Sequence, residues 1–368
     1  MDEEIQALQT NRTWILVPRL ANTNIVGSKW VFRTKYLPDG SIEHLKAPLV
    51  AKGYTQVPGL DYTDTFSPVI KATTIRVVLS LAVTNKWPLR QLDVKNAFLN
   101  GHLTESVYME QPPGYIDPRY PNHVCQLKKA LYGLKQAPRA WFQRFSSFLI
   151  QLGFSCSRAD TSLFGFHKHS DIIYLLLYVD DIIITGNNSS LLDSFTRKLN
   201  SEFATKDLGS LSYFLGLEAT PTTNGLFISQ LKYAQDILTR AQLLDNKPVH
   251  IPMVVSQHLS SDGPLFSDPT LYRSLVGALQ YLTITCPNIA YAVNSVSQFL
   301  HSPTKDHFLA VKRILHYVKG TLDFGLTFHP SNALGALIAY SDVDWAGCPD
   351  TRRSTSGYSV YLRDNLVS

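Results

Sequence analysis

The stretch YLLLYVDDIIIT, residues 174–185, places two adjacent aspartates, Asp180 and Asp181, between two apolar runs. Both runs are rich in Leu, Ile, Val and Tyr, which predicts two strands joined by a tight turn. Aspartate favours turns, so the pair taken alone is compatible with turn chemistry. The apolar flanks argue against a solvated loop, because a tight turn here would lift both carboxylates out of a buried sheet.

A third carboxylate occupies a similar position upstream. Asp93 ends the strand-like segment QLDV, residues 91–94. If the two strand ends are neighbours in one sheet, Asp93 joins Asp180 and Asp181 at a single edge. Like charges this close repel unless cations lie between them, and carboxylate oxygens suit Mg²⁺, which keeps waters and also takes substrate phosphates. Two such ions would align an attacking hydroxyl and stabilise a leaving pyrophosphate.

The composition is that of a globular protein. The 368 residues are 45% apolar and 17% charged, which is enough for two or three domains. The formal net charge of +5 only weakly indicates a polyanionic partner. The four cysteines are far apart and include no C-x-x-C pair, so neither a disulfide framework nor a zinc knuckle is indicated, and a reducing intracellular compartment is expected. No apolar run reaches the roughly 18 residues of a membrane span.

Strand and helix patterns mix along the chain without strict alternation. Strands are predicted at 26–36, 45–54, 91–99, 163–167, 172–185, 208–218, 225–230, 334–342 and 355–362. Helices are predicted at 73–85, 138–153, 191–203, 270–283, 287–300 and 304–319. Pro, Ser, Asp and Gly accumulate at 245–270, which indicates a linker or long loop. This order favours an α+β palm on an antiparallel sheet over a doubly wound fold.

Several long motifs, in a fixed order, resemble the reverse transcriptase of copia-type LTR retrotransposons. They include KWVFRTK (29–35), QLDVKNAFLNG (91–101), YGLKQAPRAW (132–141), YVDD (178–181), DLGSLSYFLGLE (207–218), YRSLVGALQYLT (272–283) and SDVDWAG (341–347). A lone YVDD would be weak, but so many motifs in order make a chance match negligible. The resemblance implies an RNA-directed DNA polymerase, a nucleotidyltransferase cut from a Pol polyprotein, folded as a right hand of fingers, palm and thumb.

The same resemblance divides the chain into fingers and palm at 1–244, thumb or connection helices at 245–330, and a truncated RNase H-like segment at 331–368. Asp342 matches the first RNase H carboxylate. The remaining RNase H acids of the pattern lie past the last residue, so RNase H activity from this chain alone is predicted to be absent. We therefore expect a fragment of a polyprotein or a decayed genomic copy.

The resemblance also assigns roles to residues. It makes Asp93, Asp180 and Asp181 the catalytic triad, holding two Mg²⁺ ions that Mn²⁺ can replace. Phe98 matches the residue that gates against a ribose 2′-hydroxyl, although the residue pattern alone favours an ordinary strand-end side chain. The other matches are Gly133, Lys135 and Gln136 near template and nucleotide, Tyr178 and Val179 facing primer and template, and Leu215 and Gly216 in the primer-grip hairpin.

A basic hairpin near the start fits a triphosphate clamp. Lys35 and Lys46 are the candidates for phosphate contacts, as point charges on the β- and γ-phosphates; solvated lysines on an exposed hairpin fit the pattern equally well. Family members usually read KARLVAKG where this chain reads KAPLVAKG, with Pro48. Proline removes a ladder donor, and the missing arginine matches a triphosphate ligand, so this substitution is expected to cost activity.

Two hypotheses follow. The first is a polymerase that acts on an RNA template, a DNA primer and dNTPs. The second is a catalytically inactive remnant that at most binds nucleic acid. No membrane association is expected. Other polyprotein segments, integrase and the remainder of RNase H, are candidate partners, and within a full element the expected location is intracellular, in a cytoplasmic virus-like particle.

Overall fold

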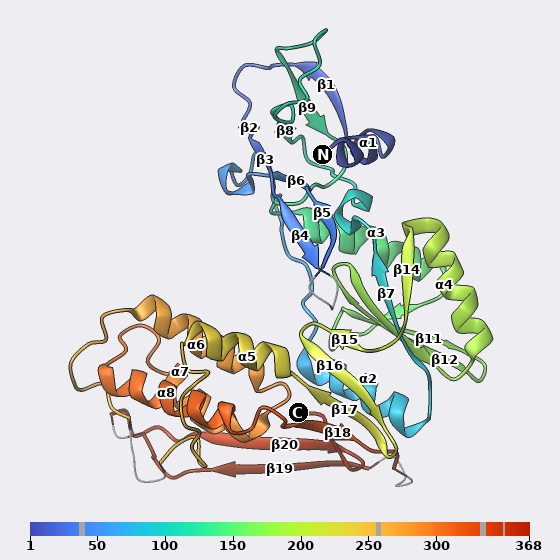
Figure 1. Cartoon of the computed structure of the whole chain (residues 1–368). Coiled ribbons are helices and arrows are strands. Elements are labelled where there is room, and N and C mark those ends of the chain that lie inside the picture. The colour runs from blue at the N-terminus through green and yellow to red at the C-terminus, as the bar shows by residue number, and fades with distance from the viewer. Residues whose placement is uncertain (37–40, 255–258, 332–335, 349) are drawn as a thin grey trace. The chain divides into compact units, whose positions relative to one another are not determined.

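The computed structural model describes residues 1–36, 41–254, 259–331, 336–348 and 350–368 (Figure 1). They form helices and largely antiparallel sheets, so the predicted mixed α and β character is confirmed. The chain divides into two compact units, which are Met1–Ile70 with Arg90–Gly209, and Lys71–Leu89 with Ser210–Ser368. None of the helices in the described part of the chain has the length and apolar composition needed to cross a bilayer.

The main sheet of the first unit carries the YVDD hairpin. Its strands follow the order β10 (Ser155–Cys156), β11 (Leu163–Lys168), β12 (Asp171–Tyr178), β13 (Asp181–Gly186), β7 (Leu89–Val94) and β14 (Thr205–Ser210). β12 and β13 pair antiparallel with Tyr178 opposite Asp181, so the predicted tight hairpin is confirmed. β13 is also the neighbour of β7, which brings the end of the QLDV strand beside the YVDD turn.

Two amphipathic helices, α3 (Ala137–Gln151) and α4 (Ser189–Phe203), pack on this sheet as their periodicity predicted. On α3, Trp141, Phe145 and Leu149 are at most 1% exposed. Burying each side chain of this size stabilises the fold by about 1.5–3 kcal/mol. The chain leaves α3 at Gly153, whose φ of +94° is a conformation that glycine adopts at little cost, so the predicted stop is confirmed.

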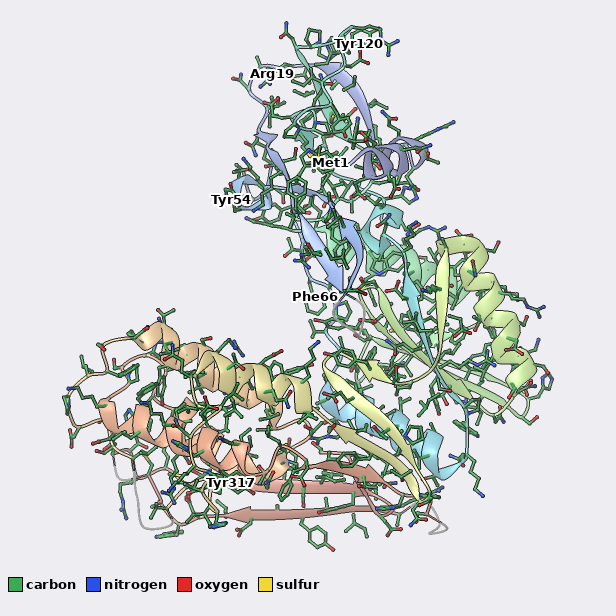
Figure 2. All side chains as sticks on the ribbon, viewed as in Figure 1. Met1, Arg19, Tyr54, Phe66, Tyr120 and Tyr317 are labelled. Carbon is green, nitrogen blue, oxygen red and sulfur yellow. The ribbon has the colours of Figure 1, made fainter. Side chains whose placement is uncertain are left out.

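The rest of the first unit consists of short pieces. α1 (Asp2–Thr10) packs on a four-stranded sheet in the order β1 (Trp14–Pro18), β9 (His123–Leu127), β8 (Tyr108–Met109) and β2 (Ile25–Val26). Two-stranded pairs join β3 (Ser28–Trp30) to β6 (Leu49–Ala51) and β4 (Arg33–Tyr36) to β5 (Ile42–Lys46). Single-turn helices η1 (Gly53–Thr55) and η2 (Ala97–Asn100) complete it. Exposed aromatic rings lie between β6 and Ile70, where the first segment of this unit ends; Tyr54 and Phe66 are both more than 70% exposed (Figure 2).

Several predicted strands proved too long. The predicted strand 26–36 is broken into β2, β3 and β4. The predicted strand 45–54 is broken at Pro48, which separates β5 from β6 and cannot donate to a ladder, although its carbonyl still accepts from Val31 N at 3.1 Å. The sequence PDG at 38–40 predicts a turn, which lies outside the described residues. The predicted strand 208–218 is likewise broken, by the change of sheet after β14.

The second unit combines a sheet with a helical cluster. The sheet follows the order β15 (Tyr213–Phe214), β16 (Leu217–Thr222), β17 (Gly225–Ser229) and β18 (Gly325–Phe328), and α2 (Ala72–Thr84) lies against β18. The cluster contains α5 (Leu231–Arg240), α6 (Pro269–Leu282), η3 (Pro287–Ile289), α7 (Ala290–Ser297) and α8 (Lys305–Lys319). At its centre the buried Tyr272 hydroxyl donates to the Val296 carbonyl at 2.7 Å.

A three-stranded sheet, β19 (Leu337–Val343), β20 (Ser356–Leu362) and β21 (Asn365–Leu366), ends the second unit. The buried Asn365 ties it to α2, because its amide donates to Ser80 Oγ and to the His329 carbonyl, both at 3.0 Å. Asp342 lies exposed on β19. Its role as an RNase H carboxylate stays a prediction.

Candidate active site

The YVDD turn is held in a strained conformation by a neighbouring helix. Val179 has a φ of +51°, which is a genuine outlier for a β-branched residue and costs on the order of 1–3 kcal/mol. Trp141 of α3 donates its indole N–H to the Val179 carbonyl at 2.7 Å. The indole is itself fixed between the rings of Phe145 and Phe203, each with a centroid 5.2 Å away. The position of the YVDD turn is therefore fixed by the packing of α3 through Trp141.

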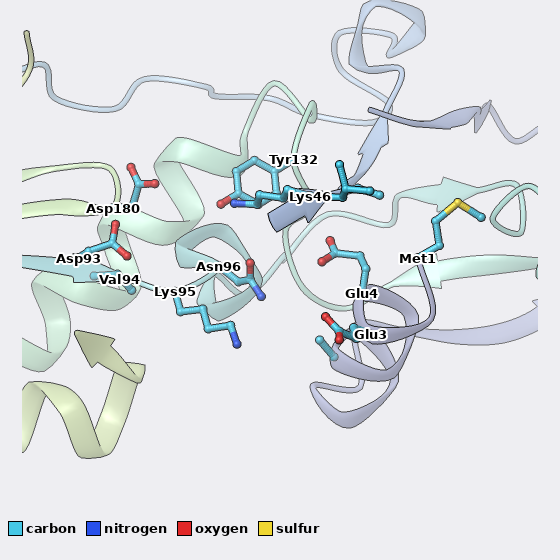
Figure 3. A pocket seen from close by; sticks show the side chains of 13 residues that line it. Met1, Glu3, Glu4, Lys46, Asp93, Val94, Lys95, Asn96, Tyr132 and Asp180 are labelled. Atoms are coloured by element: carbon cyan, nitrogen blue, oxygen red, sulfur yellow. The ribbon is translucent and has the colours of Figure 1, made fainter. Parts of the chain in front are cut away.

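Asp93 and Asp180 meet beside this turn. The Val94 backbone N–H donates to the Asp180 carbonyl at 2.8 Å, which fixes the end of β7 against the turn. Both carboxylates line one cavity of about 380 Å³, the Asp93–Asp180 cavity, and Figure 3 shows them next to each other at one end of it. The sequence pattern thus correctly placed these two acids at one edge of the sheet.

Asp181 lies next to them and is held differently. It begins β13, and its carboxylate accepts a hydrogen bond from the side-chain amide of the buried Gln91 of β7. Burial, and then the negative charges of Asp180 and Asp93, raise the pKa of Asp181 to about 6, against the opposing effect of the Gln91 hydrogen bond. The three carboxylates therefore repel one another in the folded chain, and a cation bound among them would be stabilised.

The opposite wall of the cavity is supplied by α1, β5 and Tyr132 (Figure 3). Lys46 at the end of β5 is exposed and lines the cavity. Its contact with phosphate stays a prediction. Burial, and then the charges of Asp180, Glu4 and Asp93, raise the pKa of Tyr132 to about 12, so its hydroxyl remains a donor at neutral pH. Burial also raises the pKa of Glu4, whose carboxylate accepts from Leu49 N at 3.4 Å.

Four of the predicted nucleotide-binding residues do not line this cavity: Phe98, Gly133, Lys135 and Gln136. Phe98 packs edge-on against Tyr132, with ring centroids 4.8 Å apart, and so lies behind the cavity wall. Gly133 has a φ of +90°, and a Cβ there would lie 2.1 Å from the Ala51 carbonyl oxygen. Glycine is therefore required by the close approach of the β6 backbone. Contact of Gly133 with a nucleotide stays a prediction.

Lys135 and Gln136 point into a polar network of the 56–62 segment. The Lys135 ammonium donates to the Tyr62 hydroxyl at 3.0 Å. Gln136 is fully buried; its amide donates to the Asp61 carbonyl at 2.9 Å and its oxygen accepts from Gln56 at 3.0 Å. Sequence reasoning missed this network, since its members lie about 75 residues apart in the chain. Nucleotide contacts by these two residues stay predictions.

The predicted primer contacts are distributed over both units. Tyr178 precedes the turn and Val179 lies within it, and both are half-buried. Leu215 and Gly216 form the two-residue turn between β15 and β16, with φ of +52° and +75°, and the Tyr281 hydroxyl donates to the Leu215 carbonyl. The predicted hairpin is present, and its contact with a primer stays a prediction. The Lys35 backbone lies in β4, but its side chain lies outside the described part.

The donor set fits a magnesium ion. No group of three His, Cys, Asp or Glu side chains is arranged as a ready metal cage among the described residues. Mg²⁺ does not need one, because it commonly binds one or two carboxylates and completes its shell with waters and substrate phosphates. Asp93 and Asp180 offer two carboxylates beside an open cavity, and their repulsion with Asp181 favours a cation there.

Comparison with known proteins agrees with this geometry. The profile of the family described as "Reverse transcriptase (RNA-dependent DNA polymerase)" matches residues 11–255. Across the whole chain, the sequence is 52% and 51% identical to the retrovirus-related Pol polyproteins from transposons RE1 and RE2 of Arabidopsis thaliana, and 40% identical to that from transposon TNT 1-94 of Nicotiana tabacum. The chain spans 25–28% of the length of these copia-type relatives. It belongs to the reverse transcriptase family.

Proposed function

We propose that this chain is the RNA-directed DNA polymerase of a copia-type retrotransposon. The observation that carries the proposal is the cavity in which Asp93 and Asp180 lie opposite Lys46, in a chain of the reverse transcriptase family. Carboxylates for a divalent cation and an ammonium for phosphate are what nucleotidyl transfer from a dNTP requires.

In the proposed reaction, the oxygen of a primer 3′-hydroxyl bonds to the α-phosphorus of a dNTP. The bond from that phosphorus to the oxygen bridging to the β-phosphate breaks, pyrophosphate leaves, and the hydroxyl proton passes to water. Mg²⁺ or Mn²⁺, when bound by Asp93 and Asp180, supplies neutralisation of the charge that develops on these oxygens. Lys46 binds phosphate as a point charge, and the protonated Tyr132 offers a hydrogen-bond donor to substrate oxygen.

Asp181 contributes charge rather than a ready ligand in this proposal, because its carboxylate is engaged by Gln91. Phe98 acts through the Tyr132 ring that it supports. We further assign fingers and palm to 1–244, thumb or connection helices to 245–330, and the beginning of an RNase H-like segment to 331–368. RNA template and DNA primer are the partners, and within a complete element the chain works beside integrase and RNase H segments in a cytoplasmic particle.

The test is primer extension on an RNA template with Mg²⁺ or Mn²⁺. We expect extension by the wild type and at least a hundredfold loss in Asp93→Asn and in Asp180→Asn, because each removes a metal-binding charge. Asp236→Asn, an exposed change on α5, is the matched control and should extend normally. Extension that persists in both active-site variants, with folding verified by thermal unfolding, contradicts the proposal.

One observation favours the alternative, an inactive remnant that binds nucleic acid. Pro48 adds no charge between β5 and β6, where family members usually carry arginine. If this loss alone silences the chain, Pro48→Arg should restore extension to an inactive wild type. If neither protein extends a primer and both bind a primer–template duplex, the remnant is the correct description.

A further inference from the structure

A second cavity, of about 610 Å³, adjoins the Asp93–Asp180 cavity in the first unit. Glu3, Ala7, Lys95 and Asn96 line both, so the two spaces meet at these residues. The second cavity is bounded by α1, η2 and the C-terminal end of α4. Both volumes fall in the range of roughly 300–1,000 Å³ that is typical of small-molecule sites.

The two linings differ in charge. The Asp93–Asp180 cavity has four acids, Glu3, Glu4, Asp93 and Asp180, against the ammonium groups of Lys46 and Lys95. In the second cavity, Glu3 and Lys95 are joined by one further charged side chain, Glu202, which already pairs with Arg144 of α3. Its remaining polar side chains are amides and hydroxyls, among them Gln6, Asn100, Asn200 and Ser201.

Lys95 stands at the junction of the two cavities, where its positive charge acts on the Glu4 carboxylate. It follows β7 directly, two residues after Asp93, and its side chain is exposed. It takes part in none of the ion pairs that join described residues. Figure 3 shows its side chain extending from the end of β7 on the side of α1. Its backbone is fixed by the Val94–Asp180 hydrogen bond on one side and by the left-handed Asn96, with a φ of +54°, on the other.

We propose that Lys95 binds the pyrophosphate released by nucleotidyl transfer and that the second cavity receives this product. The inference rests on the proposed function and names its product path. A pyrophosphate anion beside Asp93 and Asp180 needs cationic partners, and Lys46 and Lys95 are the two lysines that line the space. Beyond Lys95, neutral amides can replace water around the anion without the charge needed to retain it, so the product is held weakly and leaves.

The test measures pyrophosphate binding by titration calorimetry on the full 368-residue chain with Mg²⁺ and without template. Lys95→Gln should weaken binding about tenfold, which corresponds to about 1.4 kcal/mol, because it removes the ammonium that meets the anion. Lys95→Arg should restore it to within threefold. Lys168→Gln is the matched control: this exposed lysine ends β11, about 23 Å along the sheet from the YVDD turn at 3.3 Å per residue, and should bind normally.

A second variant tests the cavity itself. Ser201→Trp, on the exposed end of α4, places a bulky ring in the second cavity without touching Asp93, Asp180 or Lys46. We expect it to weaken pyrophosphate binding at least threefold and to reduce product inhibition of primer extension by the same factor. Unchanged binding in folded Lys95→Gln, or a wild type that binds no pyrophosphate, overturns the inference.

The two proposals fail separately. A wild type that extends primers while Lys95→Gln binds pyrophosphate normally remains a polymerase without this product path. A wild type that binds pyrophosphate through Lys95 but extends no primer keeps the site and loses the polymerase assignment.

Discussion

Replacing Asp181 by asparagine should stabilise the protein at neutral pH and leave its stability unchanged in acid. The pKa of Asp181 is raised from 3.8 to about 6 in the folded chain. A carboxyl whose folded pKa is raised holds its proton more tightly when folded, so the free energy of unfolding falls as pH rises from about 4 to about 6 and stays lower above that. Asparagine carries no charge at any pH, so it escapes this loss and keeps a partner for Gln91.

The magnitude follows from the shift. About two pKa units correspond to about 3 kcal/mol for a fully buried carboxyl. Asp181 is only half-buried, and solvent screening reduces the figure to about 1 kcal/mol. For a unit of the size of Met1–Ile70 with Arg90–Gly209, which contains Asp181, that is a rise in Tm of about 2–4 °C.

The assay is thermal unfolding in EDTA at pH 7.5 and at pH 4, comparing wild type, Asp181→Asn and the exposed control Asp236→Asn. We expect the gain of Asp181→Asn at pH 7.5 and a difference near zero at pH 4, with no gain for the control at either pH. A gain of equal size at both pH values, or a loss at pH 7.5, refutes the electrostatic reasoning.

Three further predictions concern packing and protonation. Trp141→Phe removes the indole N–H that holds the YVDD turn, so it should cut primer extension at least tenfold while lowering the free energy of unfolding by about 1–3 kcal/mol; extension at the wild-type rate contradicts this. Gly133→Ala should destabilise by more than 2 kcal/mol in a urea titration, because its Cβ meets a β6 carbonyl, whereas Gly59→Ala, with a positive φ but open space, should cost only about 1 kcal/mol. Burial lowers the pKa of His307, so stability should fall as pH drops below about 6.5. This fall should shrink in His307→Gln, because glutamine gains no proton there and can still accept from the Thr304 backbone N–H at the start of α8, as the His307 ring does at 3.0 Å.

The elements that the sequence predicted well are those whose periodicity extends over several turns or strand residues. The α3 and α4 stripes and the YVDD hairpin each bury one uninterrupted face, and the hydrophobic pattern alone identifies them. The two-residue strands β2 and β8 exist only because of their partners and carry no period of their own. α1 and α5 were missed as well: each is only nine or ten residues long and buries two or three side chains.

In the candidate active site too, some residue positions could be predicted from the sequence and others could not. The neighbouring positions of Asp93 and Asp180 could be predicted, because one lies near the end of an apolar strand and the other in the turn between two apolar strands. Their catalytic role stays a prediction. Lys95 and Tyr132 stand inside recognisable motifs, but nothing in their neighbours indicates which side chains reach the cavity. The burial of Gln136 depends on Asp61 and Gln56, and the sequence carries no mark of a contact between segments that far apart.

The first unit is built from two separate segments of the chain, and this determines which fragments of the protein can fold. Residues 71–89 leave the first unit to supply α2 to the second, and the chain then returns to complete the first. A fragment that stops at Gly209 therefore carries α2 without β18 or the Asn365 amide that joins it to its sheet. During synthesis α2 must wait for β18, which lies about 240 residues further along the chain, a long-range closure that slows folding. A stable fragment of the first unit should instead replace residues 71–89 with a flexible linker that joins Ile70 to Arg90.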